Sequence, residues 1–419
     1  MPFAADLMAD IRDRFAHVGE CPFEGPRIFF ENAGGALTLK SVAEGAARFA
    51  AIPDNQGRDN PASRAMMEVI ARGRADLCRL LNAPAGGEVV LGESGTELLF
   101  RLVRAACRAA APGGDVVSST LEHPASRSPA RQWAGATGRR HLMVRHDDAT
   151  GTVTAEAYAA LVTPATRVAT IVHASPVTGM GMDVAAIAGA IRAVAPDCLI
   201  IVDGIQHAAH GAIDLSAAGV DGYVVSPYKM FARHGFGAAW ISGRLAEMPH
   251  EALDGAPARV WELGTRDAGA YAALSGVVAY LDWLGGRVSG AGPGRARLEA
   301  AAAAIHAHEA DLARAMLHGT GNHRGLADMA GITILGGLDN PAREGLVSFA
   351  AEGIAAPDLV ARFGARGIRV HARKPDHYSG NVLVPLGLDG CVRVSLAHYN
   401  SPEEVARFLE AVEESLAAG

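Results

Sequence analysis

The sequence predicts an α/β protein, with a mostly parallel sheet in a large domain followed by a smaller α+β domain. In the first part of the chain, short β-branched runs alternate with alanine-rich stretches of helical periodicity, which is typical of a parallel sheet covered on both faces. These runs occupy residues 88–92, 115–119, 168–173, 198–203, 222–226 and 237–241. Weaker strand patterns at 332–335, 345–350, 368–370 and 392–395 lead into a closing helix at about 402–416.

The periodicity of the apolar residues also predicts elements outside this alternating region. Helices are expected at 3–20, 40–52 and 61–82, and a strand at 27–31. Residues 269–318 form a long helix broken near 285–294, where glycines cluster, and we expect this helix to connect the domains. The predicted organisation is an N-terminal segment packing with the small domain (1–30), a large domain (31–285) and a C-terminal small domain (286–419).

Composition argues against several classes of partner. The chain has 419 residues, of which 49% are hydrophobic and 20% charged, and its formal net charge is −7 with scattered basic residues. Without a basic stripe, nucleic acid is not expected as a partner. No apolar run is long enough for an ordinary transmembrane helix and the first residues do not resemble a signal peptide, so we expect a cytoplasmic protein without membrane association.

Cysteine spacing agrees with a reducing compartment. The five cysteines are far apart in the chain and form no CxxC pair. They are Cys21, Cys78, Cys107, Cys198 and Cys391. We therefore expect neither a disulfide framework nor a metal site.

Two charged residues follow buried strands, where open α/β sheets place ligands. Asp203 closes the apolar run 199–202, and Lys229 comes shortly after the run 222–225. A buried Asp needs a partner, which the protonated pyridine nitrogen of pyridoxal phosphate (PLP) would provide, although a loop Asp capping the next segment is an alternative. A desolvated lysine suits a Schiff base with the same cofactor, and a solvated loop lysine is its alternative.

Three further segments carry candidate ligands. Residues 92–97 contain glycine and small hydroxyl side chains before a helix, which favours either an anion site or a plain helix cap. His123 follows the strand at 115–119 and would stack on a planar cofactor or lie in a surface loop. Arg393 lies inside an apolar strand, where its partner is either a substrate carboxylate or a structural acid.

Taken together, these segments resemble the class V aminotransferase family of fold type I PLP enzymes. This family includes cysteine desulfurases, selenocysteine lyases and isopenicillin N epimerase-like proteins. The motifs are FFENAGG (29–35), SGTE (94–97), EHPAS (122–126), VDGIQHAAH (202–210), SPYKMF (226–231), ELGTRD (262–267) and VRVSLAHYNSPEEVARFLEAV (392–412). The resemblance covers nearly the whole chain. It implies a PLP-binding large domain with a seven-stranded sheet, an amino-acid substrate and a homodimer with shared active sites.

The resemblance also implies a role for each matching residue. Lys229 would form the Schiff base and act in catalysis together with His123, which would stack over the ring, while Asp203 would pair with the pyridine nitrogen. The implied cofactor contacts are Gln206 near O3′, Ser94, Gly95, Thr96 and Ser226 at the phosphate, Tyr228 where the family usually has His, and Thr265 reaching the phosphate across a dimer interface. The implied substrate contacts are Arg393 at the α-carboxylate and Asn32 and Gly34 at the mouth.

Departures from the family pattern bear on the reaction. Desulfurases carry a nucleophilic cysteine in a loop before the last strands, but residues 367–378 contain none. Cys391 should share a strand face with Arg393, so we do not expect it to replace that nucleophile. Pro176 stands where desulfurases have Asn, and the segment 175–179 is more similar to the epimerase-like branch. The basic stretch 371–377 favours a solvated loop over contact with an acidic substrate group.

The favoured reaction is therefore β-elimination by a desulfurase-like lyase, including C–S cleavage, without a persulfide. Transamination and epimerisation are alternatives on the same scaffold, because one fold hosts many chemistries. A non-catalytic PLP-binding protein is a further alternative, which the retained Lys229, Asp203 and Arg393 disfavour. A nucleotide-binding protein is disfavoured because neither GxGxxG nor GxxxxGK[ST] follows a strand.

Overall fold

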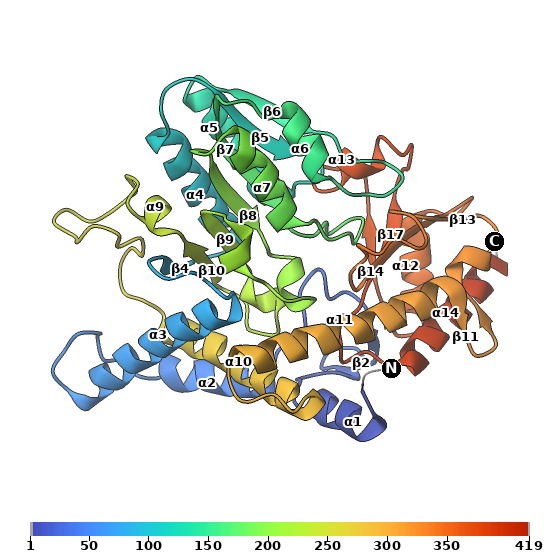
Figure 1. Cartoon of the computed structure of the whole chain (residues 1–419). Coiled ribbons are helices and arrows are strands. Elements are labelled where there is room, and N and C mark those ends of the chain that lie inside the picture. Colours follow the sequence, from blue (N-terminus) through green and yellow to red (C-terminus); the bar gives the residue numbers. More distant parts are fainter. Residues whose placement is uncertain (1–2, 418–419) are drawn as a thin grey trace.

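The computed structural model describes residues 3–417 and shows a large α/β domain beside a smaller α+β domain (Figure 1). The predicted fold class is confirmed by a seven-stranded sheet of order β4-β10-β9-β8-β7-β5-β6. All neighbouring pairs from β9 to β6 are parallel, and β10 is antiparallel to both β4 and β9. The strands are β4 (Glu88–Gly92), β5 (Asp115–Ser119), β6 (Arg140–Val144), β7 (Thr166–Val172), β8 (Leu199–Asp203), β9 (Gly222–Val225) and β10 (Gly237–Ile241).

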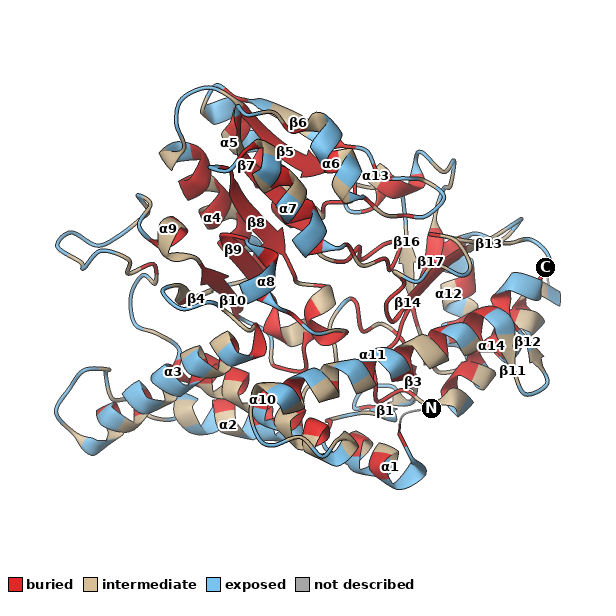
Figure 2. Ribbon diagram, in the orientation of Figure 1, coloured by how far each residue is buried: buried red, intermediate tan, exposed pale blue. Residues whose placement is uncertain are grey.

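Both faces of this sheet are apolar because helices cover both. In β8, Leu199 and Ile201 pack into a cluster with α4 (Gly95–Ala109) and α5 (Pro124–Ala136), whereas Ile200 and Val202 pack into the cluster that contains α6 (Ala155–Leu161) and α7 (Val184–Val194). Figure 2 shows the central strands as continuously buried. This explains why the strands read as short apolar runs instead of alternating patterns.

The edge strand β6 was absent from the prediction. Within the described chain it pairs only with β5, and four of its five residues, Arg140 to Met143, are exposed or half-buried. Because an edge strand needs burial on fewer sides, its apolar signal is weaker than that of a central strand.

A layer of long helices lies under the large sheet in Figure 1 and leads to the small domain. It contains α2 (Lys40–Ala50), α3 (Pro61–Leu80), α10 (Ala268–Val288) and α11 (Arg295–His318). The predicted break in the long helix is confirmed between α10 and α11. A Cβ atom at Gly285 would lie 1.9 Å from the carbonyl oxygen of Arg297, so the close approach of the two helices requires glycine there.

The small domain contains an antiparallel sheet of order β13-β14-β17-β16. Its elements are β13 (Ile332–Ile334), β14 (Leu346–Ala351), α12 (Ala356–Gly364), β16 (His371–Arg373), β17 (Cys391–Ser395) and α14 (Pro402–Ala417). The N-terminal strand β3 (Ile28–Phe29) pairs in parallel with β15 (Ile368–Arg369), and Phe30 packs into the same apolar cluster as Phe349 and Phe408. Segments from both ends of the chain therefore build this domain.

Shorter elements complete the described chain. They are α1 (Ala5–Asp13), β1 (Glu20–Cys21), β2 (Gly25–Pro26), α8 (Leu215–Ala218), α9 (Gly243–Ala246), β11 (Gly319–Thr320), β12 (His323–Arg324) and α13 (Gly380–Leu383). The helix expected at 3–20 is shorter in the structure, because the chain leaves helical geometry so that Phe15 can bridge to Leu39. None of the helices in residues 3–417 combines the length and apolar character needed to cross a membrane.

Candidate active site

Two adjoining cavities lie where the large sheet meets the small one. The inner cavity has a volume of about 80 Å³ and is lined by residues that follow the carboxyl ends of the parallel strands. They are Thr96, His123, Val172, Ala174, Pro176, Asp203, Ile205, Gln206, Ser226, Tyr228 and Lys229. The outer cavity, of about 510 Å³, adds residues of the small domain, including Arg373 and Arg393. His123, Pro176 and Lys229 line both cavities, so the two are continuous.

Asp203 is the last residue of β8 and is only 3% exposed. It lies between β7 and β9, opposite Val172 and Val224. Its Oδ1 accepts the backbone N–H of Ile205 at 3.1 Å, and no other hydrogen bond to this carboxylate occurs in residues 3–417. Burial raises the pKa of Asp203 to about 6. A buried acid with a free oxygen is suited to a cationic partner in the cavity.

Lys229 ends a 3₁₀ turn (Pro227–Lys229) that begins directly after β9 and Ser226. Burial and, to a smaller extent, the nearby charge of Arg393 lower the pKa of Lys229 to about 8, although Asp203 opposes both effects. An amine with this pKa is partly neutral near physiological pH and can act as a nucleophile or a base.

The N-terminus of α4 borders the inner cavity. Three segments approach one another closely there, at Gly95, Ser226 and Gly237. A Cβ at Gly95 would lie 2.5 Å from Ser226 Oγ, and one at Gly237 would lie 2.3 Å from the backbone carbon of Ser94. The Ser94 hydroxyl accepts the N–H of Glu97 at 3.0 Å and so caps the helix, whereas Thr96 lines the cavity. Backbone N–H groups at a helix N-terminus and two free hydroxyls form a setting that favours phosphate.

His123 is held as a neutral ring above the inner cavity. Its Nδ1 accepts the N–H of Ala125 at 3.1 Å at the start of α5, which places the proton on Nε2. Burial, followed by the charge of Lys229, lowers the pKa of His123 to about 3. Behind it, the fully buried Glu122 accepts the N–H of Val172 at 2.8 Å and ties this loop to β7. Sequence reasoning assigned no role to Glu122.

Gln206 lies on the loop after Asp203, with its Oε1 buried and without a partner within the described chain. Its Nε2 lies 3.3 Å from Nε2 of His210, whose Nδ1 lies 2.7 Å from Oε2 of Glu309 on α11. Sequence reasoning missed this chain of contacts, because Glu309 is far away in the sequence. Only the contact in the fold identifies His210 and Glu309 as supports for Gln206.

Arg393, in the middle of β17, is 3% exposed and lines the outer cavity. Its Nη1 donates to the carbonyl oxygen of Pro176 at 3.2 Å, and it forms no ion pair with any described residue. Burial and, to a smaller extent, the charge of the nearby Arg373 lower the pKa of Arg393 to about 9. The alternative that Arg393 pairs with a structural acid is therefore wrong for the described residues.

Asn32 and Gly34 differ in their position relative to the outer cavity. Gly34 lines it, but the Asn32 side chain lies behind its wall, where it donates to the carbonyl oxygen of Ser395 at 2.8 Å and accepts from Tyr399. Asn32 therefore joins the N-terminal segment to β17. Its neighbours Ala33 and Gly34 line the outer cavity, but its own side-chain amide does not. Tyr228 lines the inner cavity and stacks on His234, with ring centroids 4.4 Å apart.

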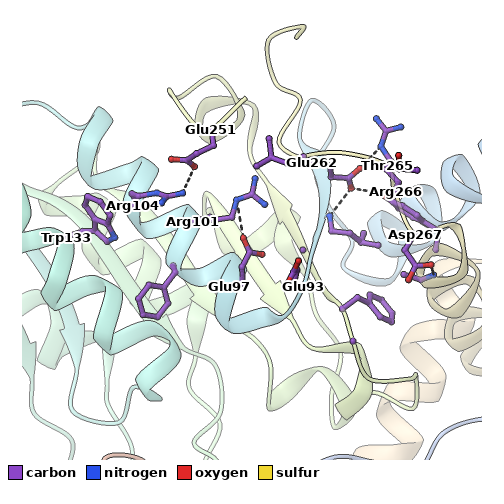
Figure 3. Close-up of a pocket in the computed structure, with 18 of the residues that line it drawn as sticks. Glu93, Glu97, Arg101, Arg104, Trp133, Glu251, Glu262, Thr265, Arg266 and Asp267 are labelled. Carbon is purple, nitrogen blue, oxygen red and sulfur yellow. Dashed lines mark hydrogen bonds and ion pairs between the residues drawn. The ribbon is translucent and has the colours of Figure 1, made fainter. Parts of the chain in front are cut away.

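Thr265 is not brought to Lys229 within one chain. It lines a separate cavity of about 720 Å³, beside Glu93, Arg101 and Glu262 (Figure 3). Within its own chain, Thr265 lines neither the inner nor the outer cavity.

All five cysteines lie within residues 3–417, and none lines the inner or the outer cavity. Cys391 is fully buried, opposite Arg373 in the pairing of β16 and β17, and burial raises its pKa to about 11. No group of three or more metal-ligating side chains occurs within the described chain.

The groups of the inner cavity fit PLP by their chemistry. Asp203 offers a buried carboxylate oxygen to a pyridinium nitrogen, the unpartnered Oε1 of Gln206 offers a polar contact, and Lys229 supplies an amine for the aldehyde. The Gly95–Ser226 approach leaves no room for a side chain, and the backbone N–H groups beside it at the start of α4 suit a phosphate. The fold and these groups define a PLP-dependent enzyme of fold type I.

Comparison with known proteins agrees with this class. The chain belongs to the aminotransferase class-V family, whose model matches residues 28–408. It is 32% identical over 354 residues to a probable cysteine desulfurase of Pseudomonas putida, covering 80% of each chain. It is also 27% identical over 406 residues to the aminotransferase-like protein FGM3 of Gibberella zeae, covering 93% of this chain and 95% of the relative.

A solved structure with the same fold is the apo cysteine desulfurase of Thermococcus onnurineus. Its TM-score is 0.83 at 20% sequence identity, and the match covers 98% of both chains. At this identity the likeness concerns the fold alone.

Proposed function

We propose that this PLP-dependent enzyme is a lyase that eliminates a substituent from Cβ of an amino acid, including by C–S cleavage, without a cysteine persulfide. The observation that carries the proposal is that no cysteine lines either cavity beside Lys229. Cys391 is buried in a strand and its thiol is held protonated, so it does not serve as a nucleophile. The leaving group must therefore depart directly.

The chain's own residues supply binding and proton transfer. Arg393 binds the substrate α-carboxylate, because its buried guanidinium has no acidic partner. When bound, PLP supplies a sink for the electron pair left at Cα. Lys229 takes the Cα proton at Nζ, which its lowered pKa permits near neutral pH. Asp203 would hold the ring nitrogen of PLP and favour its protonated form, and the neutral His123 would add no charge beside the ring.

The reaction is tested with purified holoenzyme and a set of β-substituted amino acids, following release of pyruvate, ammonia and sulfide or another thiol. We expect equimolar keto acid and ammonia, loss of product formation in Lys229→Ala, and unchanged product formation in Cys391→Ser. A dependence of turnover on Cys391 would contradict the persulfide-free mechanism, and absence of keto acid from every substrate would contradict the lyase.

A second candidate is transamination, which the likeness to a relative named as aminotransferase-like favours. Epimerisation is a third, in keeping with Pro176 in the epimerase-like segment. The same assays separate them. Transamination makes keto acid only when an acceptor keto acid is present, and epimerisation inverts Cα without releasing ammonia. A protein that binds PLP but catalyses none of these three reactions is a non-catalytic binder.

We further propose that the protein acts as a homodimer in the cytoplasm. The dimer is suggested by the resemblance, which implies that Thr265 contacts the phosphate of a neighbouring active site; within its own chain Thr265 lines the separate cavity of Figure 3 and neither cavity beside Lys229. The five unpaired cysteines agree with a reducing compartment.

A further inference from the structure

Two arginine side chains share one face of the small sheet at the outer cavity. In the antiparallel pair of β16 and β17, His371 is opposite Arg393 and Arg373 is opposite Cys391. Because side chains alternate between the two faces of a strand, Arg373 and Arg393 lie on the same face of the sheet. They are diagonal neighbours across the two strands, with Cα atoms expected to be about 7–8 Å apart. Both line the outer cavity together with Lys229.

Neither guanidinium has an acidic partner within the part of the chain that the structure describes. Arg393 makes one hydrogen bond, to the Pro176 carbonyl, and its Nε is buried without a partner. The Nε of Arg373 is likewise buried and unpartnered. By contrast, the partly buried Arg74 pairs with Glu262 at 2.8 Å. Burial lowers the pKa of both guanidiniums, and the opposing effects of Asp376 on Arg373 and of Glu31 on Arg393 do not offset it.

The carboxylates of the outer cavity do not fill this role. Glu31 lies 3.3 Å from His371, and Asp376 accepts the backbone N–H groups of Tyr378 at 2.8 Å and Ser379 at 3.3 Å. The cavity therefore presents four cationic side chains against two carboxylates that are already engaged. Leaving buried charge unpaired is costly, so a ligand with more than one anionic group is the one that this cavity stabilises most.

We propose that Arg373 binds a second anionic group of the substrate, carried on its Cβ substituent, while Arg393 binds the α-carboxylate. The substrate class is then a β-substituted amino acid whose leaving group bears a carboxylate. The assignment of this group to the leaving group rests on the proposed lyase function, whereas the binding site itself does not.

A model substrate makes the chemistry explicit. S-Carboxymethyl-L-cysteine and water would give pyruvate, ammonia and thioglycolate. The Cβ–S bond breaks with its electron pair leaving on sulfur, the Cα proton is removed by Lys229, and hydrolysis releases the nitrogen as ammonia. No oxidant or reductant is needed. The matched neutral substrate is S-carbamoylmethyl-L-cysteine, which has nearly the same shape but lacks the second charge.

Binding is tested first, with a probe that cannot react because it has no amine. Holoenzyme is titrated calorimetrically with 3-(carboxymethylthio)propanoate. A second titration uses 3-(carbamoylmethylthio)propanoate, in which the carboxymethyl carboxylate is replaced by an amide. We expect the diacid to bind about 10- to 100-fold more tightly, as charge-assisted hydrogen bonds to a buried site predict. Arg373→Gln should remove this preference while leaving amide binding unchanged, and Arg373→Lys should restore part of it.

The control is Arg369→Gln, which removes a neighbouring arginine that pairs with Glu24 and does not line the cavity. It should keep the full preference for the diacid. Equal affinity of wild-type holoenzyme for the diacid and the amide, or a preference that survives Arg373→Gln, would overturn the proposed site.

Turnover is measured separately, so that the two proposals fail differently. Release of pyruvate from S-carboxymethyl-L-cysteine should exceed release from the amide by the same factor in kcat/KM, and Arg373→Gln should abolish the difference. Diacid binding that depends on Arg373 without any keto acid would refute the lyase but keep the anion site. Turnover of both substrates at equal kcat/KM would keep the lyase and refute the site.

Discussion

At the scale of single residues, the site places charges where burial changes their protonation. Asp203 and Lys229 follow adjacent parallel strands, and burial acts on them in opposite directions, raising the pKa of the acid to about 6 and lowering that of the amine to about 8. Each group is therefore close to a protonation change near neutral pH, which is the range where a proton-transfer site is useful.

The lysine gives the first prediction. The rate at which apoprotein takes up PLP should rise with pH about a midpoint near 8, because only the neutral amine of Lys229 attacks an aldehyde. The rate is followed by the growth of the cofactor's visible absorbance after mixing. Lys374→Ala, which removes an exposed lysine at the cavity rim, should show the same midpoint. A midpoint near 10, the value of a solvated lysine, would contradict the prediction.

The aspartate gives the second prediction. Its folded pKa lies above the unfolded value, so Asp203 stabilises the apoprotein below about pH 4 relative to higher pH, and that contribution is lost as pH rises to about 6. Asp203→Asn should therefore raise the Tm of apoprotein at pH 8 but not at pH 4. The same variant should bind PLP at least about 10-fold more weakly, since a charged partner of the ring is lost.

Thermal unfolding and PLP titration measure the two effects independently. Loss of stability in apo Asp203→Asn at pH 8 would show that the carboxylate has a cationic partner in the chain itself, against the structure.

At the scale of elements, buried pairs join the loop after β8 to distant segments. Glu309 on α11 contacts His210, and Glu344, before β14, lies 2.5 Å from His207. His207 in turn stacks on His173, with ring centroids 3.6 Å apart. These contacts fix the position of the 3₁₀ turn His207–Ala209 and of Gln206 relative to the small domain.

This arrangement gives the third prediction. Glu309→Gln should lower the free energy of unfolding by about 3 kcal/mol, because it removes one partner of a buried pair. It should also shift the absorbance maximum of bound PLP, since Gln206 loses its fixed support. Glu299→Gln, on the same helix but exposed and paired with Arg295, should change stability by less than about 1 kcal/mol. A destabilised Glu309→Gln with unaltered cofactor absorbance would leave Glu309 with a structural role only.

At the scale of the whole molecule, the cavity drawn in Figure 3 shares no lining residue with the two cavities beside Lys229. Its wall combines Thr265 with the Glu262 carboxylate, which ties together Arg74 and Arg266. This network holds the segment before α10 in place. If two copies associate through this face, each would complete the phosphate site of the other.

The fourth prediction tests that arrangement. Thr265→Ala should weaken PLP binding by about 3- to 10-fold, as loss of one hydrogen bond predicts. Mixing Thr265→Ala with Lys229→Ala chains should restore wild-type affinity at half of the competent sites, because a mixed dimer pairs an intact lysine with an intact threonine. Sedimentation establishes the dimer, and PLP titration of the mixture establishes the sharing. A monomer in sedimentation, or additive behaviour of the two variants, would contradict it.

The sequence by itself determined the fold class and singled out Asp203 and Lys229 as candidate PLP ligands. Central parallel strands are buried on both faces and carry a strong apolar signal, and Asp203 and Lys229 were identifiable because they interrupt or follow such runs. The edge strands β6 and β16 carry weaker apolar patterns, so β6 was absent from the prediction and β16 was interpreted as part of a solvated loop.

Only the tertiary structure decided which distant side chains share a site. Arg373 faces Arg393 because β16 and β17 pair in one antiparallel register, and a shift of one residue would have turned Arg373 away. In the same way, Glu309 reaches His210 through helix packing, and Asn32 is drawn behind the cavity wall by Ser395 and Tyr399. Such contacts depend on register and packing between segments far apart in the chain, which local patterns do not encode.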